Sequence, residues 1–131
     1  MITMKSINLE PKVENLHMIN KFIEEELSIK QMDIKLIVEE IFINIVNYSE
    51  CNYIKVFFEL NDNKLKIIFV DDGIQFNPLL KENPEFPDNI DDVQIGGLGI
   101  HLVKSISDEI YYEYIDDENH LTIIKGVSIE E

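Results

Sequence analysis

Two spacings of apolar residues run along the chain and predict its elements. Alternation of apolar and polar positions predicts strands, and apolar residues spaced three and four apart predict helices. The predicted strands cover 2–9, 53–60, 64–70, 109–115 and 120–127. The predicted helices cover 11–28, 31–48 and 97–107, the first with Pro11 in its opening turn. This order predicts an α+β fold, a two-layer α/β sandwich whose mixed, mainly antiparallel sheet carries its helices on one face.

The segments between these elements predict turns and one long loop. "LNDNK" and "DDEN" are typical of hairpin turns. The segment 74–95 holds Pro78, Pro84 and Pro87, so we expect a lid-like loop with one helical turn after Pro78. No repeat or linker divides the sequence, and its length suits one core, so residues 1–131 are expected to form a single domain.

The helix expected over 31–48 is apolar nearly all round, which predicts burial. Glu40, Asn44 and Asn47 nevertheless fall at i, i+4 and i+7, on one stripe. Polar groups on a packed helix are costly unless they are paired or face a polar cavity. The stripe therefore caps loops and meets waters, or it lines a site. An Asn carbonyl suits Mg²⁺, and a glutamate one turn away can accept a proton from an attacking hydroxyl.

Glycine is scarce in this chain, yet four of its five glycines lie in two short segments. "VDDGIQF" ends a predicted strand in Asp71 and Gly73, where a carboxylate can accept a hydrogen bond from an amine of a ring packed on the glycine. "IGGLGIHLVKS" opens a predicted helix with Gly96, Gly97 and Gly99. Free N–H groups and the positive dipole end at such a helix start suit phosphates. Each motif alone is also typical of an ordinary turn or glycine-rich loop.

Composition and charge exclude several classes of protein. The formal net charge is −15, and none of the 11 basic residues is arginine. The chain therefore lacks a basic footprint for direct nucleic-acid binding or for an anionic membrane surface. A phosphate clamp would need lysines such as Lys81 and Lys104, magnesium or backbone N–H groups. The lone Cys51 and the absence of a long apolar run favour a cytoplasmic protein without a membrane span.

Taken together and in this order, the motifs resemble those of the GHKL ATPases, and most closely those of bacterial anti-sigma factor serine-protein kinases. "VEEIFINIVNYSE" resembles the N box, "VDDGIQFNPL" the first glycine box, and "GGLGIHLVKSISDEIYYEY" with "LTIIK" the second glycine box and closing strands. The resemblance implies the Bergerat ATP-binding fold, with ATP and Mg²⁺ as cofactors. Gln75 and Ile95 depart from it, because each stands where many members carry a glycine.

Carried over by position, the resemblance implies a role for each motif residue. Glu40 would be the general base, Asn44 the magnesium ligand and Asp71 the acceptor for the adenine amine. Thr122 would support the adenine pocket. The implied nucleotide-contacting set is Asn44, Asn47, Asp71, Gly73, Phe76, Gly96, Gly97, Leu98, Gly99, Lys104 and Thr122.

The resemblance implies an ATP-dependent serine-protein kinase. Such a protein phosphorylates a STAS-type anti-sigma-factor antagonist and sequesters a sigma factor. Members often dimerise, which leaves a homodimer open. The alternative is a nucleotide-dependent regulator of the same fold that binds its partner without phosphotransfer. The presence of Glu40 favours the kinase, and the two altered glycines favour the alternative.

Overall fold

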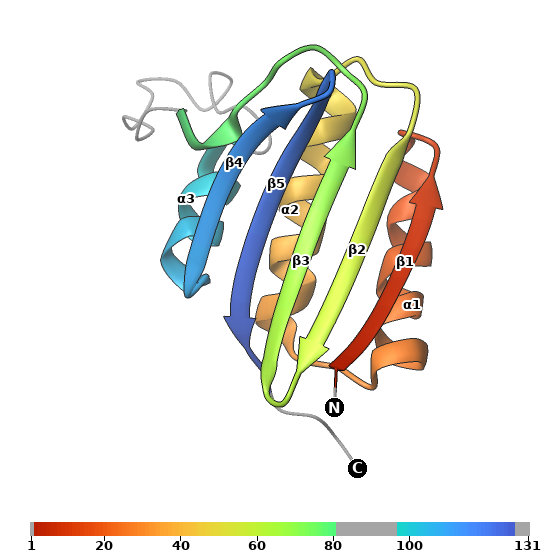
Figure 1. Ribbon diagram of the computed structural model, residues 1–131, viewed down its shortest axis with the longest axis vertical. Coiled ribbons are helices and arrows are strands. Elements are labelled where there is room, and N and C mark those ends of the chain that lie inside the picture. The colour runs from red at the N-terminus through yellow and green to blue at the C-terminus, as the bar shows by residue number, and fades with distance from the viewer. Residues whose placement is uncertain (1, 81–96, 128–131) are drawn as a thin grey trace.

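The computed structural model describes residues 2–80 and 97–127, and Figure 1 shows one sheet backed by three helices. The strands are β1 (Ile2–Leu9), β2 (Ile54–Asn61), β3 (Lys64–Asp71), β4 (Glu109–Ile115) and β5 (Glu118–Gly126). The helices are α1 (Leu16–Leu27), α2 (Met32–Tyr48) and α3 (Gly97–Ile106), with short 3₁₀ helices η1 (Val13–Asn15) and η2 (Pro78–Leu80). The predicted two-layer α+β sandwich is confirmed.

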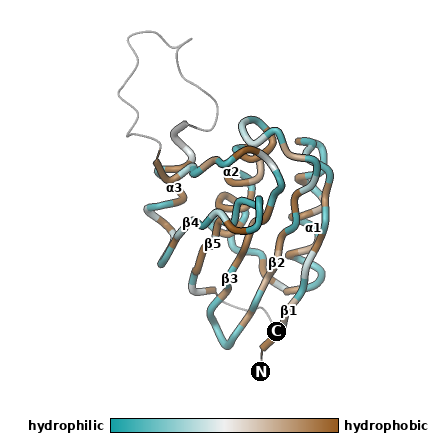
Figure 2. Tube along the Cα trace, turned by 45° about the horizontal axis from the view of Figure 1, so that its top comes forward, coloured by the Kyte–Doolittle hydropathy of each residue, from teal (hydrophilic) through white to brown (hydrophobic). Residues whose placement is uncertain are grey.

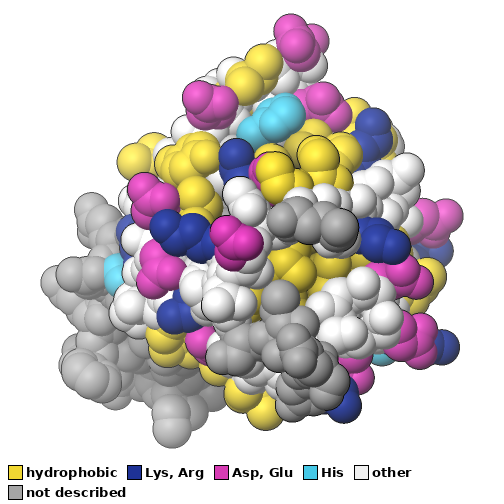
Figure 3. Space-filling model, turned by 60° about the horizontal axis from the view of Figure 1, so that its bottom comes forward, with side chains coloured by type: hydrophobic (Ala, Val, Ile, Leu, Met, Phe, Trp, Pro, Cys, Tyr) yellow, Lys and Arg dark blue, Asp and Glu magenta, His cyan; other side chains and the backbone are white. Residues whose placement is uncertain are grey.

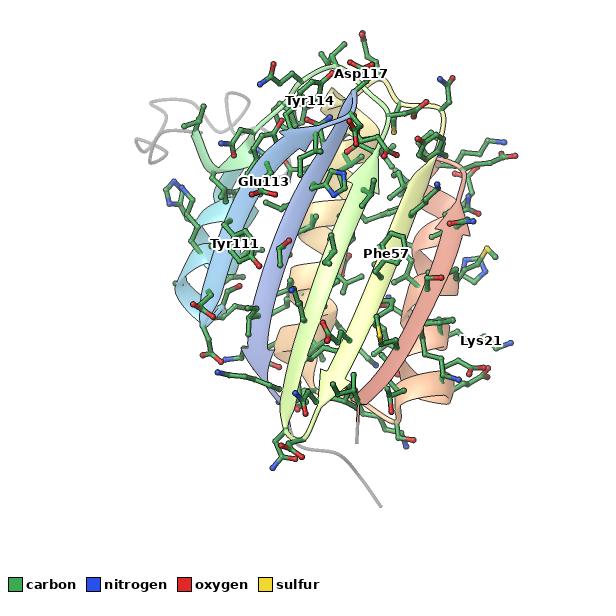
Figure 4. The ribbon with its side chains drawn as sticks, in the orientation of Figure 1. Lys21, Phe57, Tyr111, Glu113, Tyr114 and Asp117 are labelled. Atoms are coloured by element: carbon green, nitrogen blue, oxygen red, sulfur yellow. The ribbon has the colours of Figure 1, made fainter. Side chains whose placement is uncertain are left out.

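The strands are arranged in the order β1-β2-β3-β5-β4, and each neighbouring pair is antiparallel. The expected mainly antiparallel sheet thus contains no parallel pair among the described strands. All three helices cover the same face of this sheet (Figure 1). Phe57 of β2 and Tyr111 of β4 project from the opposite face, toward the viewer of Figure 4.

The core lies between the sheet and the helices, where the hydrophobic positions of α2, β2, β3 and β5 meet (Figure 2). Alternate residues of the central strands are fully buried there, among them Val56, Phe58, Ile67 and Phe69. Helix α2 lies across the middle of the sheet and also contacts both α1 and α3. None of the described helices combines the length and apolar character needed to cross a bilayer.

Two predicted boundaries differ from the structure by more than one residue. The helix expected from Pro11 opens as the 3₁₀ turn η1, a common form of helix start, and α1 begins at Leu16. The closing hairpin is tighter than expected. Asp116 and Asp117 both have positive φ (51° and 63°), typical of a two-residue turn, so β5 begins at Glu118. As a result Asn119, expected in the turn, lies in the strand opposite Asp71.

Candidate functional site

A buried carboxylate at the end of β3 organises one half of the site. Asp71 is only 2% exposed, and its Oδ1 accepts three hydrogen bonds. The donors are the Ser49 hydroxyl, the Gly73 backbone N–H at 3.0 Å and the Asn119 side-chain amide at 3.0 Å. None of these bonds uses Oδ2. The cluster lies at the end of the sheet marked by Asp117 in Figure 4. Asp71 therefore acts as a fixed acceptor there.

Gly73 allows the chain after β3 to pass directly against the end of α2. A Cβ on Gly73 would overlap both the Ser49 hydroxyl and the Ser49 backbone carbonyl. That carbonyl accepts a hydrogen bond of 2.8 Å from the Ile74 N–H. Ser49, the C-cap residue of α2, is itself fully buried. The glycine predicted from the sequence is therefore required by close backbone packing.

The second half of the site joins α2 to the start of α3. A Cβ on Gly99 would overlap the carboxylate of Glu40, so this carboxylate lies directly on the first turn of α3. Among the described residues no hydrogen bond reaches the Glu40 carboxylate. Burial, and secondarily the negative charge of Glu39, raises the pKa of Glu40 above its ordinary value. A carboxylate that holds a proton more readily than usual is suited to general base chemistry.

The predicted polar stripe on α2 divides into a buried part and an exposed part. Asn44 is 1% exposed, and its Nδ2 donates to the Glu40 backbone carbonyl at 2.8 Å. The oxygen end of this amide consequently points away from the helix's own backbone. Asn47, in the last turn of the helix, is exposed. The structure thus buries Asn44, leaves Glu40 half-buried and leaves Asn47 at the surface.

Two further predicted contacts lie around the segment after Gly73. Phe76 is half-buried, and its ring lies 5.7 Å from that of Tyr48 between centroids. Lys104 lies in the last turn of α3, away from the helix start, and its ammonium donates to the Leu79 carbonyl at 2.7 Å. Lys104 therefore fastens the η2 segment to α3 in this structure.

Thr122 does not join the Asp71 cluster. Its neighbours Leu121 and Ile123 belong to the core, so the alternation of β5 turns the Thr122 side chain to the face without helices. Register places Thr122 opposite Ile68 and Asn119 opposite Asp71. Asn119, rather than Thr122, is thus the residue of β5 that contacts Asp71.

The remaining predicted positions lie at the start of α3 or precede it in the sequence. Gly96, together with Ile95 and Lys81, lies outside the described residues. Gly97 is the first residue of α3, and Leu98 follows it in the helix.

Two members of the site were missed in the sequence. Ser49 directly follows the predicted helix. It belongs to the site because it packs against Gly73 and its hydroxyl donates to Asp71, two contacts that the sequence does not show. Asn119 was assigned to a turn, although the spacing of Leu121 and Ile123 places it on their face of the strand. Cys51 lies nearby, partly buried and packed against the core. Burial, with a smaller contribution from the charge of Asp71, raises the pKa of its thiol to about 11.

Apart from this site, described residues of the sheet also line a cavity. A cavity of about 540 Å³ lies at the turn between β2 and β3, the end of the molecule turned forward in Figure 3. Its lining combines lysines with carboxylates, among them Lys64, Lys66, Glu59 and Asp62. It lies at the opposite end of the sheet from Asp71. The described residues also contain no group of three or more His, Cys, Asp or Glu side chains arranged to hold a metal ion.

The two halves of the site are held by one helix. Ser49 follows Glu40 by nine positions, which corresponds to about 13 Å along α2 at ~1.5 Å per residue. Asp71 at one end can accept from a ring amine, and the start of α3 at the other end carries the N–H groups that favour phosphate. This arrangement fits an elongated ligand with a base and a phosphate end.

Comparison with known proteins agrees with this arrangement. Residues 10–125 match the family described as the histidine kinase-like ATPase domain. The chain is similar to serine-protein kinase RsbW of Staphylococcus epidermidis, at 31% identity over 108 residues that cover 76% of this chain and 67% of the relative. It is also similar to serine-protein kinase RsbW of Staphylococcus aureus (strain JH9), at 34% identity over 87 residues that cover 60% of this chain and 55% of the relative. The chain thus spans about half the length of these Staphylococcus aureus relatives.

The match extends from the end of β1 to the end of β5, so it contains every site residue described above. The order of motifs, the fold and the relatives agree with one another. The chain belongs to the histidine kinase-like ATPase domain family, and its resemblance to the GHKL ATPases of the serine-protein kinase type is confirmed.

Proposed function

We propose that this protein binds ATP with Mg²⁺ and transfers the γ-phosphoryl group to a serine of a partner protein. The single observation that carries the proposal is the contact between the Glu40 carboxylate and Gly99. This contact puts the Glu40 carboxylate, whose pKa is raised, against the start of α3, and a helix start favours phosphate binding. A general base must lie within hydrogen-bond reach of the hydroxyl that it deprotonates, and a position next to the proposed phosphate site supports this role for Glu40.

The adenine end of the nucleotide is assigned to Asp71. Because three donors already occupy its Oδ1, the proposed contact is from the ring amine to Oδ2. Gly73 and Phe76 follow in the same segment and would flank the ring. The family relationship supports ATP as the nucleotide.

The residues present also fit a magnesium ion. Asn44 is buried next to Glu40 on α2, and its side-chain amide carries an oxygen of the type that Mg²⁺ accepts as a ligand. Mg²⁺ prefers oxygen ligands and is often held by few protein groups together with substrate phosphates. When bound, the ion would neutralise charge on the phosphates. We therefore assign it to Asn44.

In the proposed transfer, Glu40 accepts the proton of the acceptor serine hydroxyl. The serine oxygen then bonds to the γ-phosphorus as the bond to the β–γ bridging oxygen breaks, and ADP leaves. The names of the relatives support a serine as the acceptor. From the motif resemblance we assign the acceptor to a STAS-type anti-sigma-factor antagonist and a second partner to a sigma factor, with cytoplasmic location and a homodimer as further parts of the proposal.

Two measurements on the purified chain test the proposal in sequence. Calorimetric titration with ATP and Mg²⁺ is expected to show saturable binding. Incubation with γ-labelled ATP and a STAS-domain antagonist is then expected to label the antagonist on serine. Absence of heat with any adenine nucleotide would refute the whole proposal. Binding without labelling would refute the kinase and leave a nucleotide-dependent regulator.

Gly99→Ala tests the contact that carries the proposal. The three atoms nearest to the added methyl group all belong to the Glu40 side chain, so we expect the carboxylate to be displaced while the helix is retained. We expect phosphotransfer to fall about 10–100-fold, because small displacements of a catalytic group are costly. Thermal stability should be unchanged or slightly higher, since alanine favours a helix. The measurements are the transfer rate and the melting temperature.

Gly126→Ala is the matched control for this variant. A Cβ at Gly126 meets its nearest neighbour, Asp108 Oδ2, at 3.6 Å, which is an ordinary contact. This variant should transfer phosphate at the parental rate. Equal activity of the two alanine variants would refute the placement of Glu40.

A further inference from the structure

One buried amide joins four segments of the adenine half of the site. Asn119 of β5 is 4% exposed and takes part in four hydrogen bonds. Its Nδ2 donates to Asp71 Oδ1 at 3.0 Å and to the Ile74 carbonyl at 2.7 Å. Its Oδ1 accepts from the Phe76 N–H at 2.9 Å and from the Tyr112 hydroxyl. The hydrogen-bonding capacity of this side chain is therefore fully used.

The orientation of this amide is set by its partners. The carboxylate oxygen of Asp71 and the carbonyl oxygen of Ile74 can only accept, and the N–H of Phe76 can only donate. A rotated amide would place its oxygen against two acceptors and its NH₂ group against a donor. Because the group is buried, such mismatched contacts would be costly. Asn119 therefore always presents a donor to Asp71.

The Asn119 donor helps to fix the orientation of the Asp71 carboxylate. With three donors on Oδ1, the carboxylate is held in one orientation and its rotation is blocked. The same amide holds the carbonyl of Ile74 and the N–H of Phe76, the two residues that flank Gln75. The segment at Gln75 is thus held in place by a side chain from another strand.

We infer that Asn119 is a positioning residue that sets base specificity, by fixing Asp71 so that the site selects a purine bearing an exocyclic amine over one bearing a carbonyl. The inference rests on the proposed nucleotide site and adds a residue to it. It also accounts for the tolerance of a side chain at Gln75, since the adjoining backbone is fixed by Asn119. A ring carbonyl placed at Asp71 would face an acceptor without a shared proton, which is strongly unfavourable.

The test compares ATP with inosine triphosphate, which carries a carbonyl oxygen in place of the amine. Dissociation constants are measured with Mg²⁺ for the parental chain and for Asn119→Asp, which keeps the shape and removes the donor. The parental chain is expected to prefer ATP by at least about tenfold, the size expected for a hydrogen bond to a charged group. In Asn119→Asp this preference should fall to within about threefold. The KM for ATP should rise while kcat at saturating ATP changes little.

A second variant and a control keep the test decisive. Asn119→Ser shortens the side chain without adding a charge and should lose the preference in the same way. Tyr53→Phe removes a neighbouring hydroxyl, which donates to Glu118 at 2.5 Å rather than to Asp71, and should keep the parental preference.

The outcomes separate this inference from the proposed function. A parental preference retained in either folded Asn119 variant would overturn the inference alone, as would failure of both variants to fold, which would make Asn119 purely structural. Absence of nucleotide binding by the parental chain would overturn the inference together with the proposed function.

Discussion

Glu40→Gln is expected to lower phosphotransfer by about 10²–10⁴-fold, the usual contribution of a general base. Glutamine keeps the shape of the side chain against Gly99, but its amide cannot accept the proton of the acceptor serine. Nucleotide affinity should therefore remain within a few-fold of the parental value. The measurement is the single-turnover rate of label transfer, with binding followed by calorimetry.

The same substitution is expected to raise stability at neutral pH. Burial raises the pKa of Glu40 in the folded state, so the folded protein binds this proton more tightly than the unfolded chain. The resulting stability is fully present below the unfolded pKa and is lost as the pH rises through the folded pKa. Ionised Glu40 thus destabilises the fold at pH 7, and glutamine removes this cost. The gain in melting temperature should be larger at pH 7 than at pH 4.

Glu39→Gln is the matched control for both effects. Glu39 precedes Glu40 on α2 and contributes only a secondary electrostatic effect to the raised pKa. This variant should transfer phosphate at nearly the parental rate and should gain less stability. A Glu40→Gln variant that transfers normally would refute the base assignment. A loss of stability at pH 7 would show that the charge of Glu40 is compensated in the folded protein.

Local pattern was sufficient to predict most of the fold. The bounds of β1 and β4 agree with their predictions. The helical turn expected after Pro78 is present as η2. The start of α1 was misplaced, since Pro11 is also compatible with the bend before the 3₁₀ turn. The start of β5 was misplaced because a two-aspartate turn looks like a longer polar turn in sequence.

Predicting the site was harder, because its contacts join distant segments. Glu40 and Gly99 were each singled out, but their mutual contact depends on how α2 packs on α3. Asn119 reaches Asp71 across 48 positions, through the register of β5 on β3. Alternation alone would have shown that Thr122 faces away from the core residues Leu121 and Ile123. Residue type was therefore enough to single out individual site residues such as Glu40 and Gly99. The contacts between residues on different strands could be predicted only from the strand register.

Gly73→Ala is expected to damage the fold itself, with a loss of about 2–3 kcal/mol in the free energy of unfolding. The added methyl group overlaps the backbone carbonyl of Ser49 as well as its hydroxyl. Since backbone cannot rotate away as a side chain can, the segment after β3 must move. That movement breaks the Ile74 hydrogen bond to Ser49 and disturbs the donors on Asp71. Urea unfolding measures the loss, and calorimetry should show much weaker ATP binding.

A double variant separates the side-chain overlap from the backbone overlap. Combining Gly73→Ala with Ser49→Ala removes the hydroxyl but leaves the carbonyl in place, so stability should not recover. Gly126→Ala again serves as the control and should unfold like the parental chain. Recovery in the double variant would mean that only the hydroxyl resists the methyl group. The contrast with Gly99→Ala follows from the same geometry: a methyl group against the end of Glu40 displaces a catalytic group, whereas one against the Ser49 backbone displaces the chain that carries Asp71.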